Sequence, residues 1–200
     1  MRSRRSRSTI YPRRAAFFRG ELREFLLLVR EQRIAPTEPR GSFAGALGVP
    51  QFMPGSYRAF AVDFDGDGHI DLWGSPADIV GSVASFLARH DWQRGQPALL
   101  PAAIAEDSLP AVRRRLDGGI SERRMLDAWA ADGVAPAGAP WDLAVDPVGV
   151  LLLEERDADG TEDASYWIAC QNFYVLTRYN RSRLYAAAVD ELARTIKSSR

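Results

Sequence analysis

Apolar residues near the start of the chain recur with the period of an α-helix. They are spaced at i, i+4, i+7, i+8 and i+11: Phe18, Leu22, Phe25, Leu26 and Val29. This spacing predicts a helix over about 15–33 that ends before the loop 36–39. Further apolar residues widen the same face: Phe17, Leu27 and Leu28. We therefore expect this helix to be buried on most of its sides.

A second helix is predicted by its first residues. Ser75 stands at the N-cap, Pro76 at the first helical position and Asp78 at the third, a combination typical of helix starts. An apolar stripe follows them: Ile79, Val83, Phe86 and Leu87. The pattern predicts a helix that ends near His90.

The segment 41–57, between these two helices, follows no regular period. Four glycines recur in it among small residues: Gly41, Gly45, Gly48 and Gly55. Such glycines permit close approach to the backbone. The segment is therefore either a tightly packed loop or a floor on which a ligand lies.

Prolines divide the second half of the chain into short pieces. We expect a short helix within 121–131. Two strands, 148–154 and 165–170, are joined by the polar turn 156–163. An amphipathic helix over 183–196 closes the chain. Helices first, then a small β region and a final helix indicate the α+β class.

Composition and charge narrow the class of protein. The 200 residues are 46% hydrophobic, and 26 acidic residues balance 26 basic ones, as in an ordinary folded domain. The first nine residues hold four arginines, but no apolar signal-peptide core follows them. A nucleic-acid arm is the rival interpretation. Because no aromatic or lysine-rich tract follows, we expect no nucleic-acid partner.

Two further absences bear on location and chemistry. No apolar run approaches the ~20 residues that span a bilayer, so we expect no membrane span. No signal peptide or lipid anchor is visible either. The one cysteine, Cys170, lies in an apolar run and is predicted to be a small core residue.

The sharpest local pattern is an aspartate-rich loop. Asp63, Asp65 and Asp67 match positions 1, 3 and 5 of an EF-hand calcium loop. Gly68 matches the sharp turn at position 6, and His69 at position 7 would bind through its backbone carbonyl. Carboxylates this close repel one another, and a hard dication bound by oxygen relieves that repulsion.

The loop departs from the EF-hand pattern at position 12, where Gly74 replaces the bidentate glutamate. A later acid must complete the ligand shell, and Asp78 is the candidate, although it can also serve the helix N-terminus. We predict a structural Ca²⁺ site with five contributors: Asp63, Asp65, Asp67, His69 and Asp78. The alternative is an acidic, solvated turn.

Short segments spread over the chain form one combined pattern: Tyr11-Pro12-Arg13-Arg14, Gly20-Glu21-Leu22, 41–48, 51–54, Ser56-Tyr57, the aspartate loop, 81–84, 172–174, 177–180 and Tyr185. Together these segments resemble the B-type lytic murein transglycosylases, both membrane-bound and soluble. The resemblance covers roughly 11–196. Its specificity lies in the combination, because no single segment is diagnostic.

The resemblance implies a mainly helical, lysozyme-like core with an EF-hand-type calcium loop and a small β region. It implies cleavage of the MurNAc–GlcNAc β-1,4 bond of peptidoglycan. Where most glycosidases use two carboxylates, this family uses one glutamate, first as acid and then as base on the sugar's C6 hydroxyl. No water enters, and the product is a 1,6-anhydro sugar. A monomer without organic cofactor, acting on glycan strands in the periplasm or cell envelope, is expected.

The family's catalytic glutamate precedes the Tyr-Pro-Arg-Arg element. The ten residues before Tyr11 contain no acid, so we expect that glutamate to lie upstream of Met1 and assign no catalytic residue. Glu21 and Glu24 follow on the next helix. We interpret them as surface or salt-bridged helix acids.

The sugar-binding positions of the family can be carried over to this chain. They are Ser42, Gln51, Phe86, Tyr179, Asn180 and Tyr185. Gln51 offers both a donor and an acceptor to N-acetyl and hydroxyl groups, and Phe86 is suited to stacking on a sugar. For each position the alternative is ordinary packing or capping. Arg13 and Arg14 fit either the cleft, facing peptide carboxylates, or surface salt bridges.

The expected organisation has four parts. Residues 1–10 form a basic, disordered leader, and 11–97 a helical part with the sugar-binding and calcium loops. Residues 98–171 form a small α/β insertion with a β-hairpin, and 172–200 a cleft loop with the closing helix. Three functions remain open: a lytic transglycosylase, a catalytically inactive calcium-stabilised peptidoglycan-binding module, and a truncated fragment.

Overall fold

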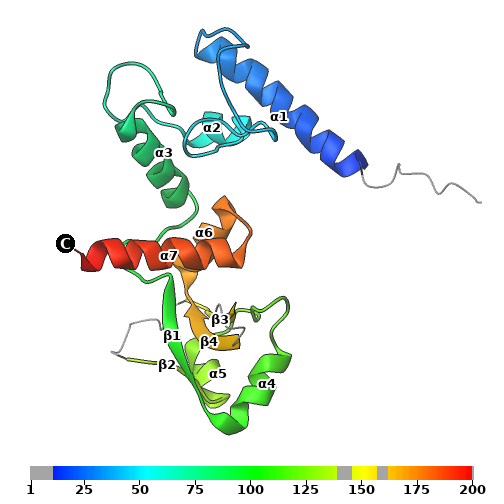
Figure 1. Cartoon of the computed structure of the whole chain (residues 1–200), viewed down its shortest axis with the longest axis vertical. Coiled ribbons are helices and arrows are strands. Elements are labelled where there is room, and N and C mark those ends of the chain that lie inside the picture. Colours follow the sequence, from blue (N-terminus) through cyan, green and yellow to red (C-terminus); the bar gives the residue numbers. More distant parts are fainter. Residues whose placement is uncertain (1–10, 139–145, 157–161, 200) are drawn as a thin grey trace, which may run out of the picture. The chain divides into compact units, whose positions relative to one another are not determined.

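The structure, a computed structural model, describes residues 11–138, 146–156 and 162–199 (Figure 1). The chain divides into two compact units, the first ending at Arg89 and the second beginning at His90. The expected leader and the middle of the expected turn 156–163 lie outside the described residues. No described helix is long and apolar enough to cross a membrane.

In the described part of the N-terminal unit, residues 11–89, three helices are joined by long loops (Figure 1). They are α1 (Tyr11–Glu31), α2 (Pro54–Phe60) and α3 (Pro76–Ala88). The guanidinium of Arg58 on α2 forms a fork with Glu31 on α1, with Nε–Oε2 and Nη2–Oε1 distances of 2.8 and 2.7 Å. Helix α1 is the predicted first helix, and it begins a turn earlier than expected.

The expectation that α1 is buried on most sides is wrong for this unit. Leu28 and Val29, near its C-terminal end, are buried. Four apolar side chains in the preceding turns are about half exposed: Phe17, Phe18, Leu22 and Leu26. The two-turn helix α2 is too short to cover the whole length of α1. Periodicity therefore located the helix, but three of the five residues that it placed on the buried face are exposed.

Helix α3 begins as predicted. The hydroxyl of Ser75 accepts a hydrogen bond from Asp78 N at 3.3 Å, and Pro76 occupies the first turn. The hydroxyl of Ser82, which is fully buried, accepts a bond from Val62 N at 3.0 Å. These bonds fix α3 against the chain on either side of the aspartate loop.

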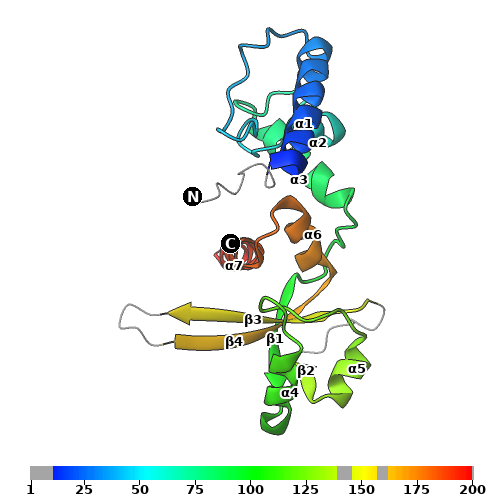
Figure 2. The ribbon, with the colours of Figure 1, turned by 90° about the vertical axis from the view of Figure 1, so that its right-hand side faces the viewer.

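The C-terminal unit is built on an antiparallel sheet with the strand order β2-β1-β4-β3. The strands are β1 (Leu99–Ile104), β2 (Val134–Pro136), β3 (Gly149–Arg156) and β4 (Glu162–Ala169). Figure 2 shows β3 and β4 side by side, and their register pairs Val150 with Ile168. The predicted hairpin is confirmed.

Short helices complete the core of this unit: the 3-10 turn Glu106–Ser108, α4 (Leu109–Arg114) and α5 (Leu126–Ala131). Trp129 of α5 is fully buried and donates from Nε1 to Val148 O at 2.9 Å. Cys170 packs in the same apolar cluster, and burial raises the pKa of its thiol to about 12. The prediction of a core cysteine is confirmed.

Two helices follow the sheet, α6 (Gln171–Tyr179) and α7 (Arg183–Ser198). The predicted closing helix is α7, and Ser182 caps it by accepting a hydrogen bond from Tyr185 N at 3.2 Å. The segment expected to be a loop is largely α6. Its buried face includes Phe173 and Val175.

Candidate functional site

The aspartate loop connects α2 to α3. Asp63, Asp65 and Asp67 each present a carboxylate oxygen, and these oxygens lie within 4.8 Å of one another. Three like charges at this separation repel one another strongly. A divalent cation bound between the oxygens would reverse the sign of that interaction.

Hydrogen bonds within the loop hold the carboxylates in place. Asp63 accepts from Gly66 N at 2.7 Å and from Gly68 N at 2.9 Å. Both glycines have a positive φ, 78° and 91° respectively, which residues with a side chain rarely adopt. Asp65 accepts from the hydroxyl of Ser75 at 2.7 Å. An all-oxygen cluster on a tightly turned loop fits the chemistry of Ca²⁺.

Asp78 ties both ends of the loop to the first turn of α3. Its carboxylate is 1% exposed and accepts from Phe64 N at 2.7 Å and from Asp71 N at 2.8 Å. These two bonds hold the pKa of Asp78 below its usual range. The structure therefore gives Asp78 an anchoring role, in addition to any contact with a cation.

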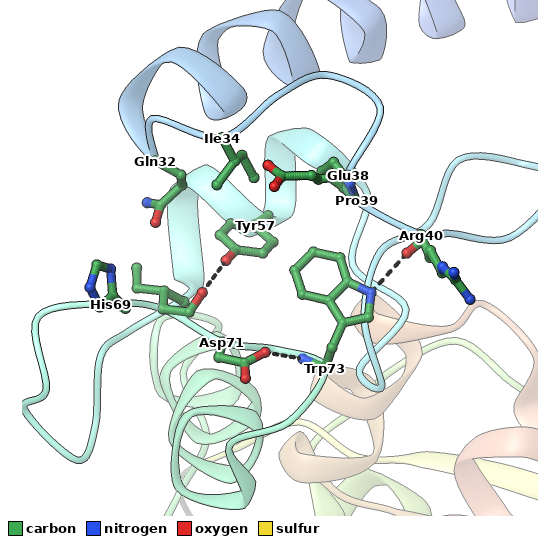
Figure 3. Close-up of a pocket in the computed structure, with 10 residues that line it drawn as sticks. Gln32, Ile34, Glu38, Pro39, Arg40, Tyr57, His69, Asp71 and Trp73 are labelled. Atoms are coloured by element: carbon green, nitrogen blue, oxygen red, sulfur yellow. Dashed lines mark hydrogen bonds between the residues drawn. The ribbon is translucent and has the colours of Figure 1, made fainter.

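A hollow of about 470 Å³ lies beside the exit of the loop (Figure 3). Tyr57 is buried and donates to Ile70 O at 2.7 Å, and Trp73 Nε1 donates to Arg40 O at 2.9 Å. Their ring centroids lie 6.2 Å apart. The side chain of His69 lines this hollow. Its backbone carbonyl is therefore the group that we expect to contribute to a cation site. Tyr57 belongs to the segments that carry the family resemblance, whereas Trp73 was not predicted from the sequence, because its backbone acceptor lies 33 residues away along the chain.

Ser42 lines a second hollow, of about 340 Å³, in the N-terminal unit. The side chains of Phe18, Glu21 and Leu22 on α1 contribute to the same hollow. Ser42 is exposed, and its hydroxyl accepts from Ala46 N at 3.1 Å. The hydroxyl hydrogen remains available for a ligand.

Gln51 is exposed at the tip of a tight turn. Its φ is 55°, a left-handed conformation that is uncommon for a residue with a side chain. Two backbone bonds between Leu47 and Phe52, of 2.7 and 3.0 Å, hold the turn. The side-chain amide donates to Gly48 O at 2.8 Å. The same left-handed backbone occurs at two other exposed polar residues, Arg33 and Asp91.

Glu21 and Glu24 are both engaged with α2. Glu21 Oε2 accepts from Gly55 N at 2.9 Å, where the helix N-terminus favours a negative charge. Glu24 forms an ion pair with Arg58. The interpretation of Glu24 as a salt-bridged helix acid is confirmed, and Glu21 serves as an interhelical cap.

The assignment of Phe86 to sugar stacking is wrong in this unit. Its side chain is 6% exposed. The ring packs edge-on against Phe60, with centroids 4.9 Å apart, and against Phe52 at 5.9 Å. A ring enclosed by other rings has no free face for a sugar, so Phe86 is a core residue.

The remaining candidates lie together in the C-terminal unit, where α6 ends and α7 begins. Asn180 is exposed and accepts from Ser182 N at 3.0 Å, and Tyr185 is 39% exposed. Burial, with a smaller contribution from Tyr185, raises the pKa of Tyr179 to about 12. Tyr179 is therefore a neutral hydrogen-bonding group at physiological pH.

The combination of a helical unit, an aspartate loop and a small antiparallel sheet defines a lysozyme-like transglycosylase fold. The chain belongs to the transglycosylase SLT domain family, which matches residues 4–194. It is 40% identical over 194 residues to membrane-bound lytic murein transglycosylase B of Escherichia coli strain K12. That match covers 95% of this chain and 48% of the relative, so the chain spans about half of that protein.

Solved structures give the same result. Soluble lytic transglycosylase SltB1 from Pseudomonas aeruginosa is 44% identical with a TM-score of 0.78, over 96% of this chain and 60% of that one. Escherichia coli Slt35, in complex with calcium, is 39% identical with a TM-score of 0.76, over 96% and 56%. Pseudomonas aeruginosa SltB3, in complex with NAG-anhNAM-pentapeptide, is 31% identical with a TM-score of 0.72, over 92% and 47%.

Proposed function

We propose that this chain forms part of a peptidoglycan lytic transglycosylase. The reaction is non-hydrolytic cleavage of the MurNAc–GlcNAc β-1,4 bond, which leaves 1,6-anhydro-MurNAc ends and remodels the cell wall. The observation that carries the proposal is the 40% identity to a lytic murein transglycosylase over 95% of the chain. The periplasm or cell envelope is the proposed location, because the substrate lies there, and a monomer is the proposed state.

Five polar residues are proposed to contact the glycan. The N-terminal unit contributes Ser42 and Gln51, and the C-terminal unit Tyr179, Asn180 and Tyr185. Hydroxyl and amide groups both donate and accept, as sugar hydroxyl and N-acetyl groups require. The phenol of Tyr179 is neutral at physiological pH, because a tyrosine ionises only near pH 10 and burial raises this pKa further, so it can donate a hydrogen bond without adding charge.

The chemistry needs one carboxylic acid. It gives its proton to the glycosidic oxygen as the C1–O bond breaks, and then accepts the proton of the C6 hydroxyl, whose oxygen bonds to C1. We assign no residue of this chain to that role, since Glu21 caps α2 and Glu24 pairs with Arg58. The engagement of both acids favours a second candidate function, a catalytically inactive, calcium-stabilised peptidoglycan-binding module or fragment.

We further propose that the aspartate loop holds one structural Ca²⁺. Asp63, Asp65 and Asp67 would supply carboxylate oxygens, His69 its backbone carbonyl, and Asp78 the closing acid. The proposal is supported by the spacing of the three carboxylates and by the similarity to Slt35, which was solved with calcium. The ion would offset two of the negative charges of the loop and hold α3 in place.

The proposal is tested by incubating the purified chain, with calcium, on intact murein sacculi and analysing the released products by mass spectrometry. Muropeptides one water lighter than hydrolytic products would establish transglycosylase activity. Sacculus binding without release would establish the binding module. A chain that neither releases products nor binds sacculi would contradict both functions. Gln51→Ala, at an exposed position that leaves the core intact, is expected to weaken binding.

A further inference from the structure

A hollow of about 510 Å³ in the C-terminal unit has an unusual lining. Three of its five lining residues are arginines and none is acidic: Arg123, Tyr174, Thr177, Arg178 and Arg181. They come from the last turns of α6, from the short segment between α6 and α7 and from the segment that precedes α5. Volumes of this size hold small organic ligands rather than a single ion.

One of the three guanidinium groups is fixed by neutral partners alone. Arg123 donates from Nε to Pro147 O and from Nη2 to Gln171 Oε1, both at 2.9 Å. Its Cζ lies 4.5 Å from the centroid of the Tyr174 ring, a cation–π contact. None of these partners carries a negative charge, and no carboxylate in the described part of the chain forms an ion pair with Arg123.

The other two arginines are exposed at the end of α6. Among the described residues, no carboxylate pairs with Arg178 or Arg181. Other arginines of the same unit do have such partners, as Arg124 has in Asp132 and Arg194 in Asp190. Three guanidinium groups that have no carboxylate partner within the described ranges therefore line one hollow. Their positive charge attracts an oxyanion, and the planar guanidinium forms paired bonds to carboxylate oxygens.

We propose that this hollow, the arginine pocket, binds a carboxylate of the peptide that peptidoglycan carries. The inference rests on the proposed function and adds a peptide-recognition site to it. Arg178 directly precedes Tyr179, and Arg181 directly follows Asn180, both proposed glycan contacts. A peptide attached to a sugar held at those residues is confined near the pocket, which raises its effective concentration there.

The test compares two soluble glycan preparations, one carrying its peptides and one from which an amidase has removed them. Binding is measured by isothermal titration calorimetry for the wild-type chain, for the double variant Arg178→Gln/Arg181→Gln and for Arg114→Gln. Arg114 is an exposed arginine of α4 outside the pocket, so it shows what the loss of one positive charge elsewhere on the surface does to binding. Circular dichroism verifies that all three proteins fold.

The double variant is expected to bind the peptide-bearing glycan with an affinity at least about tenfold lower than the wild type, because at least one charge-assisted hydrogen bond is lost. Its affinity for the peptide-free glycan should equal that of the wild type, and Arg114→Gln should match the wild type on both. The wild type should therefore prefer the peptide-bearing glycan. The wild type should bind the free peptide more tightly in its acid form than in its carboxamide form. The double variant should bind the two forms equally.

Two outcomes overturn the inference while leaving the proposed function intact. The first is equal binding of both glycans by wild type and double variant. The second is arginine-dependent binding of inorganic phosphate or phosphatidylglycerol vesicles without any preference for the peptide acid. A wild-type chain that binds neither glycan contradicts the proposed function itself, and the inference falls with it.

Discussion

At the scale of single residues, Gly149 and Tyr174 lie in close contact in the C-terminal unit. A Cβ added at Gly149 would overlap the hydroxyl oxygen of Tyr174. That hydroxyl is buried and has no hydrogen-bond partner among the described residues, and burial raises its pKa to about 12. Position 149 therefore has no room for a larger side chain, and the group that fills the space beside it is a buried hydroxyl without a described hydrogen-bond partner.

We predict that Gly149→Ala lowers the free energy of unfolding by about 1–3 kcal/mol, since it forces atoms into occupied space. Tyr174→Phe should raise it by about 1 kcal/mol, because it removes a buried, unpaired hydroxyl. In the double variant the two changes should be non-additive, with part of the loss recovered. Urea unfolding followed by circular dichroism measures all four proteins. Additive effects would show that the hydroxyl is not what excludes a side chain at position 149.

A second prediction at the residue scale concerns how the stability of the chain changes at low pH. Asp132 accepts a hydrogen bond from Arg124, and Arg115 Nη2 lies 3.6 Å away. The bond to Arg124, with both positive charges, lowers the pKa of Asp132 from its ordinary value. A carboxyl with a lowered folded pKa contributes stability above its unfolded pKa and loses it as the pH falls through the folded value.

The wild-type chain should therefore lose more stability than Asp132→Asn as the pH is lowered from about 5 to 3. Unfolding free energies at several pH values measure the difference. Glu122→Gln is a matched control, because the only ion pair of Glu122 with a described residue is the one with Arg115, and Glu122 is more exposed than Asp132. Parallel pH profiles for wild type and Asp132→Asn would contradict the assigned cause.

Residue types and spacing predicted part of the candidate site. The aspartate loop and the Ser75 cap were found because their determinants are local. The exclusion of Phe86 was not foreseeable, since an aromatic stripe looks the same in a core and on a binding floor. The partners of Glu21 and Arg58 lie 34 or 27 residues away, so no local pattern connects them.

At the scale of elements, the aspartate loop is the part most sensitive to solution conditions. Calcium at 100 times its dissociation constant should stabilise the chain by about 2.7 kcal/mol. Asp65→Asn should remove most of that gain, because it deletes one charge from the cluster. Asp91→Asn, at an exposed acid outside the loop, should keep it. Melting temperatures with calcium and with a chelator measure both, and an equal calcium response in the two variants would refute a site at this loop.

Elements with local signals were predicted well, and those that depend on distant pairing were not. Strand β1 escaped notice because Pro101 lies within it, and proline usually interrupts a strand. Pro101 is tolerated there because it has no N–H group that needs an acceptor, and its carbonyl oxygen accepts a hydrogen bond from Ala137 N at 2.8 Å. The helix expected within 121–131 begins only at Leu126. The residues before it form backbone hydrogen bonds with β3 and with Val148, just before that strand; Ser121 N, for example, donates to Val150 O at 2.9 Å.

At the scale of the whole molecule, the chain consists of two units with separate cores. The N-terminal unit holds the aspartate loop, whereas the C-terminal unit is organised around the sheet and Trp129. Local opening should therefore respond to calcium in one unit and not in the other.

We predict that removing calcium speeds hydrogen exchange in α3 and in the loop before it by at least tenfold, while amides of β3 and β4 keep their protection. Exchange followed by mass spectrometry of peptic fragments resolves the two units. Equal acceleration in both would mean that the chain opens as one cooperative body. The amides of α5, which pack on the sheet core, serve as an internal reference.

At the left-handed turn of Gln51, the residue that best fits the backbone differs from the residue that best serves glycan binding. A glycine at position 51 would adopt the same backbone without steric cost, so a population of variants selected only for heat resistance should drift towards glycine there. Selection for growth that depends on cell-wall turnover should restore glutamine, whose amide glycine lacks. The frequency of the two residues under the two regimes would reveal which demand has shaped this turn.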